Sequence, residues 1–234
     1  MLHDLLADVD DVVADLARQR SRLSRSSTAE RVADILRERI IEGSFPPGER
    51  LSEETISEGL GDSRNTLREA FRLLGHERLL DHRLNRGVFV RVPSVEDVSD
   101  LYAMRRVLEG AAVRRGASER TLTLIKEAVR DAEQAAAQDD WQSVGTANIR
   151  YHQALVSIHG SPRLDETMRQ LLAELRLVFH VMDNPRAFHE PFIGRNRTLL
   201  GLLESGRPEE AAAYLDDYFD EAERLLIHAY QPNR

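Results

Sequence analysis

Residues 51–76 read LSEETISEGLGDSRNTLREAFRLLGH, and this segment decides the fold of the first part of the chain. It holds two short stretches with an apolar residue every three or four positions, which is the period of an amphipathic helix. Each stretch follows a serine that can act as N-cap, Ser52 or Ser63, and Gly61-Asp62 between them is typical of a tight turn. The sequence therefore predicts two short helices joined by a turn.

A further helix is predicted before this segment, and a β-hairpin after it. Residues 28–42 carry an apolar stripe at helical spacing. Residues 79–82 and 88–92 change to the alternating period of strands, and residues 85–87 (Asn-Arg-Gly) stand at the turn between them. Two short helices followed by a hairpin make a winged helix-turn-helix, a fold that binds DNA.

The second short helix carries the residue types that read DNA. The first residues of a recognition helix face base edges in the major groove, and arginine can bond guanine with two donors at once. The hairpin turn is placed to reach the DNA backbone or the minor groove. The predicted DNA contacts are Ser63, Arg64, Asn65, Arg68, Arg86 and Gly87. The alternative is a solvated helix face whose arginines pair with Glu58, Asp62 and Glu69.

After Pro93 the sequence predicts helices only. The expected helices span residues 94–116, 118–138, 141–159, 162–183, 188–205 and 208–229. Helices joined by short loops favour an antiparallel bundle, so the fold class is mainly α. The predicted parts are an N-terminal extension at 1–27, a winged helix-turn-helix at 28–92 and a helical domain at 93–234.

Composition bounds the class of protein. The chain has 234 residues, of which 41% are hydrophobic and 31% charged, which is ordinary for a globular protein with a packed core. No apolar run is long enough to span a bilayer, and the start does not resemble a signal peptide. We therefore expect a cytoplasmic protein with no membrane partner. The net charge of −8 argues against a DNA-packaging protein, which would bind through a basic surface.

Residues 46–80, PPGERLSEETISEGLGDSRNTLREAFRLLGHERLL, resemble the signature of the GntR family of bacterial transcription regulators. The matching residues are Leu51, Glu53, Leu60-Gly61, Ser63-Arg64, Leu67-Arg68-Glu69-Ala70 and the leucine-rich stretch from Leu73 to Leu80. The resemblance implies that Arg64 and Arg68 are the main DNA contacts. It also implies a homodimer that binds double-stranded DNA at a palindromic operator.

Three small departures from the GntR signature leave the predicted contacts in place. Asp62 replaces the usual valine, Asn65-Thr66 replaces a commoner small-residue–proline pair, and Arg78 replaces a commoner glycine. The second half also resembles this family, in its FadR C-terminal domain (FCD) subfamily. The runs that carry this resemblance are DVSDLYAMRRVLEGAAVRRGA at 97–117 and RNRTLLGLLESGRPEEAAAYLDDYFDEAERLL at 195–226.

Many FCD domains hold a divalent metal with an aspartate or asparagine and three histidines. In this sequence the implied ligand positions are occupied by Asn148, His152, Asn196 and Tyr218. Only one imidazole remains among them, so we expect no cofactor and no tight metal site. If a metal binds, His152 with Asn148 would hold it, and the histidines left to supply a non-standard site are His159, His180 and His189.

The same four polar side chains are expected to converge inside the bundle, where they need partners. Water or a small polar or carboxylate effector would supply them, and Arg105 on the first helix suits a carboxylate. The predicted effector site is Arg105, Asn148, His152, Asn196 and Tyr218. Two alternatives remain: Arg105 is a surface residue paired with Glu109, and His152 is a core histidine bonded to Asn148.

These patterns predict a transcription regulator whose operator affinity is controlled by a small organic-acid-like effector in the helical domain. The alternative is a metal-dependent sensor of the same architecture. An enzyme is not expected, because the sequence lacks a nucleophile with its base, a phosphate loop and an intact metal centre.

Overall fold

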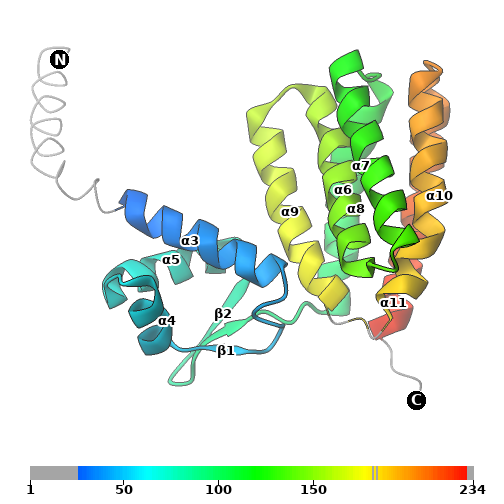
Figure 1. Ribbon diagram of the computed structural model, residues 1–234. Coiled ribbons are helices and arrows are strands. Elements are labelled where there is room, and N and C mark those ends of the chain that lie inside the picture. The colour runs from blue at the N-terminus through cyan, green and yellow to red at the C-terminus, as the bar shows by residue number, and fades with distance from the viewer. Residues whose placement is uncertain (1–25, 181, 183, 231–234) are drawn as a thin grey trace, which may run out of the picture. The chain divides into compact units, whose positions relative to one another are not determined.

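The computed structural model describes residues 26–180, 182 and 184–230, and the chain divides into two compact units between Arg91 and Val92 (Figure 1). All but the last two residues of the predicted N-terminal extension lie outside the described residues. None of the described helices is long and apolar enough to cross a membrane.

The first unit is a three-helix fold with a small antiparallel sheet. Its elements are α3 (Ser26–Ile41), β1 (Arg50–Leu51), α4 (Glu53–Leu60), α5 (Arg64–His76), β2 (Leu80–Arg83) and β3 (Gly87–Val90). The strand order is β1-β3-β2, with Leu51 opposite Val88 and Leu80 opposite Val90. The predicted helices and hairpin are confirmed. Strand β1 was not predicted, because two residues are too few to show an alternating pattern.

Local chemistry sets where α4 and α5 begin and end. The Ser52 hydroxyl accepts a hydrogen bond from the backbone N–H of Thr55, and Ser63 does the same for Thr66. Gly61 ends α4 in the left-handed conformation, with φ of 65°, which glycine adopts without steric cost. Both helices therefore start at the serines that the sequence indicated.

Helix α5 has one buried and one exposed face. The buried face carries Leu67, Ala70, Phe71 and Leu74, all at most 1% exposed. The opposite face presents arginines at every fourth position, as the helical period requires. Burial of four apolar side chains on one face fixes which residues α5 turns towards solvent.

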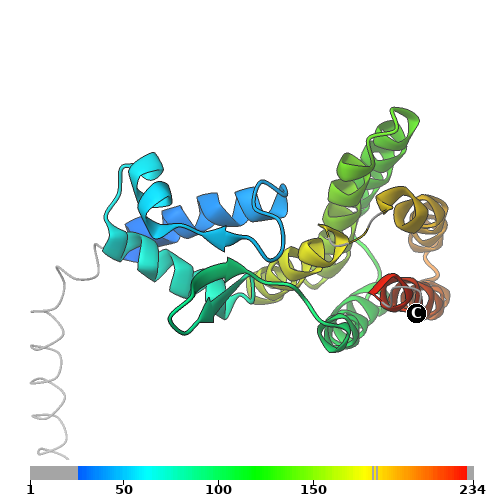
Figure 2. The ribbon, with the colours of Figure 1, turned by 90° about the horizontal axis from the view of Figure 1, so that it is seen from below.

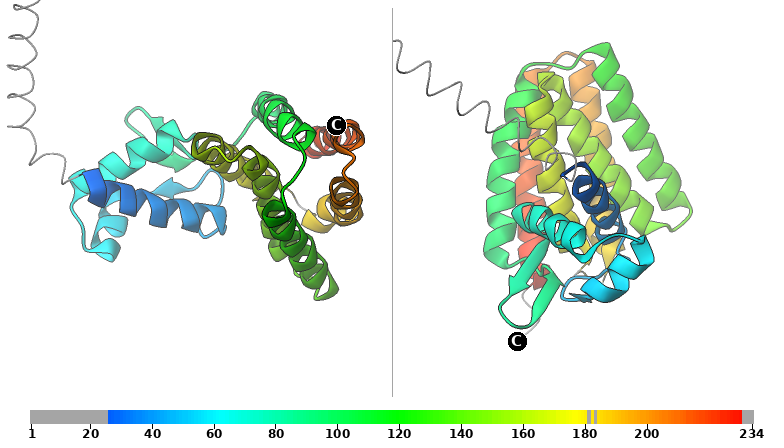
Figure 3. Two further views of the ribbon diagram at one scale, coloured as in Figure 1. Left: turned by 90° about the horizontal axis from the view of Figure 1, so that it is seen from above. Right: turned by 90° about the vertical axis from the view of Figure 1, so that its left-hand side faces the viewer.

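The second unit consists of helices, in agreement with the predicted bundle. Its elements are α6 (Val95–Arg114), α7 (Glu119–Ala137), α8 (Trp141–Val156), the 3-10 turn η1 (Ser157–His159), α9 (Pro162–His180), α10 (Pro185–Glu204) and α11 (Pro208–Tyr230). Figure 2 shows α11 nearly end-on, and the right-hand view of Figure 3 shows that the axes of the helices in this unit are roughly aligned. The most extensive packing is between α7 and α8 and between α6 and α11, so helices distant in sequence as well as consecutive ones form the bundle.

Helices α8, α9 and α10 each have one boundary three residues from the sequence-based expectation, and α9 ends at His180 instead of residue 183. Helix α10 was expected to begin at residue 188 but begins at Pro185, because the Asn184 side chain caps it by accepting a hydrogen bond from the Ala187 N–H. The helix expected over 141–159 ends at Val156, and its last residues tighten into η1. The predicted start at Ser94 is confirmed as a capping box with Asp97.

Candidate DNA-binding surface and buried polar cluster

The arginines of α5 lie on its exposed face, and each is held by a carboxylate. Arg64 Nη2 donates to Glu54 Oε1 at 2.9 Å, and Arg68 Nε donates to Glu53 Oε2 at 2.8 Å. The side chains of both arginines are more than half exposed, at 58% and 62%. These are surface ion pairs, which contribute little to folding.

The carboxylate partners differ from those considered in the sequence analysis. Of Glu58, Asp62 and Glu69, only Glu69 pairs with an arginine of the described residues, which is Arg72 at 2.6 Å. The Asp62 carboxylate instead accepts from the Ser63 N–H at 2.7 Å. Glu53 and Glu54 were missed, because they are distant from the arginines in sequence and reach them only through the packing of α4 on α5.

The other predicted contacts on α5 are Ser63 and Asn65, and both are exposed. The Ser63 hydroxyl is engaged as the helix cap and lies 2.8 Å from the Thr66 hydroxyl. This arrangement fixes the helix N-terminus, whose N–H groups favour a phosphate.

The hairpin turn presents further arginines. Arg86 and Gly87 lie there as predicted, and Gly87 has a φ of 103°, which disfavours any side chain. The Arg50 side chain packs against Gly87, so that a Cβ built on Gly87 would lie 3.2 Å from Arg50 Nε. Arg83 lies over the Phe89 ring at 4.4 Å. None of these three arginines forms an ion pair within the described residues, so no carboxylate holds them away from a phosphate.

The second unit holds a buried polar cluster at the centre of its helices. On α6, Arg105 Nε donates to Glu109 Oε1 at 2.8 Å, and both side chains are at most 1% exposed. The other oxygen of Glu109 lies 2.6 Å from Nδ1 of His152 on α8. Arg105 does pair with Glu109, but the expected alternative of a surface pair is wrong, because the pair is buried.

The cluster continues from His152 to α10 and α11. The Tyr218 hydroxyl lies 3.2 Å from His152 Nε2 and 3.4 Å from Asn148 Oδ1. The Asn196 amide donates to the same Asn148 oxygen at 3.1 Å. Helices α6, α8, α10 and α11 therefore bring together all five residues of the predicted effector site. Glu109 joins them as a member that the sequence analysis had considered only in the alternative, as the surface partner of Arg105.

Charge in the cluster is set by burial and by the Arg105–Glu109 pair. Burial acts to lower the pKa of Arg105, but the charge and hydrogen bond of Glu109, together with Tyr102 and Tyr218, raise that pKa overall. Burial likewise opposes ionisation of Glu109, but Arg105 holds the pKa of this carboxyl below its ordinary value. Burial lowers the pKa of His152. We therefore assign a charged pair beside a neutral imidazole that donates from Nδ1 to Glu109.

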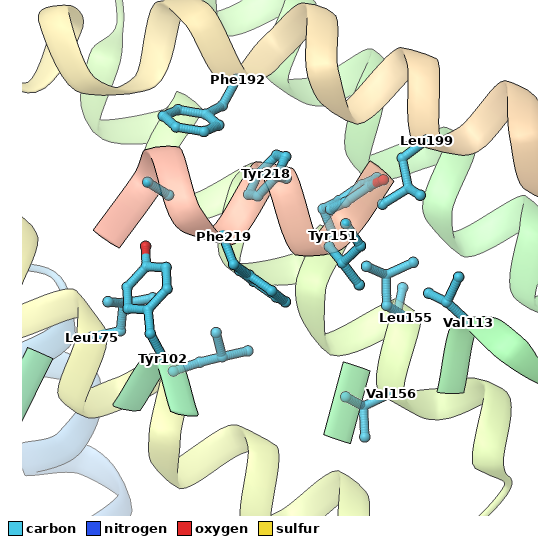
Figure 4. Packing of buried hydrophobic residues seen from close by; sticks show 14 of the residues in the cluster. Tyr102, Val113, Tyr151, Leu155, Val156, Leu175, Phe192, Leu199, Tyr218 and Phe219 are labelled. Atoms are coloured by element: carbon cyan, nitrogen blue, oxygen red, sulfur yellow. The ribbon is translucent and has the colours of Figure 1, made fainter. Parts of the chain in front are cut away.

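Aromatic rings surround the charged pair. The Arg105 guanidinium carbon lies 4.9 Å from the ring centre of Tyr102 and 4.8 Å from that of Phe219, which favours a cation through the ring faces. Figure 4 shows Tyr102, Phe219 and Tyr218 among the buried hydrophobic side chains of this unit. Burial raises the pKa of Tyr102 to about 12 and that of Tyr218 well above its ordinary value, so both phenols stay protonated at neutral pH.

Two buried atoms in the cluster have no hydrogen-bond partner among the described residues. These atoms are Nη2 of Arg105 and Oδ1 of Asn196. The Tyr218 hydroxyl, in addition, has one hydrogen for two acceptors, His152 Nε2 and Asn148 Oδ1. Because Asn148 Oδ1 also accepts from the Asn196 amide, Tyr218 can donate to His152 without leaving that oxygen unpaired. Unpaired buried groups are costly, so the cluster offers one donor and one acceptor that remain to be satisfied.

The residues of the cluster do not fit a divalent metal. Both ring nitrogens of His152 already have partners, and the described residues contain no metal-binding group of three or more His, Asp or Glu side chains. The histidines considered for a non-standard site lie elsewhere. His159 Nε2 lies 3.2 Å from the Leu108 carbonyl, and His189 packs edge-on against Phe179.

The fold of the first unit and its exposed arginines define a winged helix-turn-helix protein that binds DNA. Residues 28–90 match the family of bacterial regulatory proteins of the gntR type, and residues 100–221 match the FCD domain. The chain thus belongs to the GntR family of bacterial transcription regulators that carry an FCD domain. It is a regulator of transcription rather than an enzyme.

Solved structures and curated proteins agree with this assignment. A crystal structure of a GntR transcriptional regulator from Rhodococcus sp. RHA1 is 48% identical, covers 88% of this chain and all of that one, and has a TM-score of 0.82. McbR/YncC from E. coli, at 22% identity and 87% and 99% coverage, shares the fold with a TM-score of 0.74. The regulator YdhC of Bacillus subtilis is 26% identical over 85% of this chain and 91% of its own.

Proposed function

We propose that this regulator is a homodimer whose affinity for a palindromic operator is changed by a small organic acid bound at the buried polar cluster. The observation that carries the effector site is the pair of unsatisfied buried atoms, Arg105 Nη2 and Asn196 Oδ1. A polar network that closes on itself would leave neither. Such a regulator acts in the cytoplasm, where bacterial DNA lies.

The hydrogen-bonding needs of the cluster describe the effector. Arg105 needs an acceptor, which a carboxylate oxygen supplies, and its Nε can keep its bond to Glu109 meanwhile. Asn196 Oδ1 needs a donor. A molecule with a carboxylate and a neighbouring hydroxyl meets both needs, so we assign a small hydroxy acid as the effector class.

Curated relatives are compatible with this class without fixing the compound. They include the Galactonate operon transcriptional repressor of Escherichia coli, 28% identical over 64% of this chain and 75% of its own. The Nta operon transcriptional regulator of Aminobacter aminovorans is 26% identical over 78% of this chain and 88% of its own. These operons differ, so the effector class assigned here is drawn from the polar cluster of this chain.

On the DNA side we assign base reading to α5 and backbone contacts to the hairpin. Arg64 and Arg68, with Asn65 beside them, would face base edges, and Arg86 with Gly87 would approach the sugar-phosphate backbone. Phosphate contacts by arginine make binding salt-dependent, so each hairpin arginine should contribute about one unit to the salt slope. A palindromic operator follows, because a two-fold dimer reads two inverted half-sites.

The proposal is tested with DNA chosen by the protein itself. The full-length protein is used to select binding duplexes from a random library, and fluorescence anisotropy then measures affinity for the selected duplex. A panel of small hydroxy acids, the same acids without the hydroxyl, and neutral polyols are added in turn. We expect a hydroxy acid to shift operator affinity by about 5- to 150-fold. If none of these compounds changes the operator affinity, the proposed effector class is refuted.

A matched pair of variants on α10 assigns the response to the cluster. Asn196→Ala removes the unsatisfied buried oxygen, whereas Thr198→Ala changes an exposed hydroxyl that bonds only the Gly194 carbonyl. We expect the first variant to bind operator but lose the response to the acid, and the second to keep it. Equal responses from the two variants would place the effector elsewhere.

A further inference from the structure

The two leading arginines of α5 are held by their carboxylate partners through different nitrogens. Glu53 accepts from Nε of Arg68 at 2.8 Å, and Glu54 accepts from Nη2 of Arg64 at 2.9 Å. Both glutamates are adjacent residues in the first turn of α4. The two neighbouring glutamates of α4 therefore bond different guanidinium nitrogens of the two arginines of α5.

The difference matters because a guanidinium has two edges that each present two parallel N–H donors. The side edge consists of Nε and Nη2, and the end edge of Nη1 and Nη2. Glu53 occupies Nε of Arg68, and no described residue bonds Nη1 or Nη2 of that arginine. Its end edge is complete, and two parallel donors are what O6 and N7 of a guanine accept.

Arg64 is bonded at a different nitrogen. Glu54 accepts from Nη2, which carries one N–H on each edge, so one edge of Arg64 also keeps both of its donors. The two carboxylates differ instead in how firmly each is held. The Glu53 side chain is 32% exposed and that of Glu54 is 68% exposed, so Glu53 is the better-held carboxylate.

We propose that Glu53 is a specificity-determining positioning residue, which fixes the end edge of Arg68 towards a guanine, and that the more exposed Glu54 fixes no edge of Arg64 and opposes DNA through its charge alone. The proposal rests on the assignment of α5 as the base-reading helix. Either carboxylate opposes DNA through its charge, whatever the sequence. Only Glu53 offsets this repulsion, because it orients Arg68, and it does so only where a guanine is present to accept from Arg68.

The test compares Glu53→Ala with Glu54→Ala, which remove the same charge from the same helical turn. Full-length proteins are measured on three duplexes: the one selected by the wild type, one with its half-site guanines replaced by adenines, and a scrambled one. Glu53→Ala should lower the ratio of affinities for selected and scrambled DNA about tenfold, within the discrimination of one bidentate contact. Glu54→Ala should tighten binding to every duplex about two- to fivefold, as expected for release of a surface ion pair, and leave the ratio unchanged.

A conservative variant separates positioning from charge. Glu53→Gln loses the charge but keeps an oxygen that accepts from Nε, so it should retain most of the discrimination that Glu53→Ala loses. Circular dichroism of both alanine variants checks that α4 stays folded, since each loses one acidic residue from its first turn.

The proposal is overturned if Glu53→Ala behaves like Glu54→Ala, with tighter binding everywhere and an unchanged ratio. It is also overturned if Glu53→Ala keeps the preference for guanine over adenine in the half-site. A wild-type protein that selects no sequence from the library contradicts the proposed function itself, which is a separate result.

Discussion

Replacing Glu109 by glutamine tests the buried cluster as a charged unit. The carboxylate is completely buried and is the only described ion-pair partner of Arg105, whose side chain is 1% exposed. In Glu109→Gln the guanidinium keeps its charge but loses its counter-charge in a buried site. Removing one partner of a buried pair costs about 3–5 kcal/mol, because a desolvated charge is left unpaired.

The matched control is Glu133→Gln in the same unit. Glu133 pairs with Arg197 at 2.6 Å, but these side chains are 35% and 65% exposed. The same substitution there should cost about 0–1 kcal/mol. Urea unfolding followed by circular dichroism measures both variants, and the transition of the helical unit should move in Glu109→Gln alone.

A double variant shows whether the loss comes from the unpaired charge. Adding Arg105→Met to Glu109→Gln removes the cation while keeping an apolar side chain of similar length among the aromatic rings. Stability should recover by about 1–3 kcal/mol relative to Glu109→Gln, since neighbouring groups in one network are not additive. A loss below about 1 kcal/mol in the single variant, or no recovery in the double, would refute the reasoning.

Three further predictions follow from other parts of the molecule. Arg68→Ala should weaken binding to the selected duplex by about 1–3 kcal/mol and leave the circular dichroism spectrum unchanged; equal binding would remove α5 from the interface. Burial lowers the pKa of His189 from 6.5 to about 3. On acidification this histidine therefore binds a proton at a higher pH in the unfolded chain than in the folded chain. Stability should then fall by about 2 kcal/mol from pH 7 to pH 5, and His189→Gln should lose this part of the pH dependence. Gly145→Ala should cost about 1–3 kcal/mol in urea unfolding, because its Cβ would lie 2.5 Å from Arg176 Nη1. Gly194→Ala, where nothing lies within 4 Å, should be neutral or stabilising.

The parts of the fold that could be predicted are those fixed by residues close in sequence. Ser52 and Ser63 cap the helices that follow them, because a cap acts over three residues. Pro185 carried a comparable local signal for the start of α10, as proline favours the first helical position. Strand β1 gave no such signal, because its pairing with β3 is decided by distant residues.

The site shows the same division between local and distant information. Arg105 and Glu109 are one turn apart, so their pairing was considered, but their burial depends on α8 and α11 packing over them. His152 was considered as a core histidine bonded to Asn148, whereas its nearest partners are Glu109 and Tyr218. Periodicity describes one helix at a time, so it could not predict partners that come from other helices.

The central claim, that an acid in the helical unit and DNA on the winged unit are coupled, has one direct thermodynamic test. Isothermal titration measures the affinity of the active hydroxy acid for the free protein and for the protein saturated with its selected duplex. Coupling must be reciprocal, so this ratio should equal the factor by which the acid changes DNA affinity, about 5- to 150-fold. An acid that binds equally well with and without DNA would contradict the account.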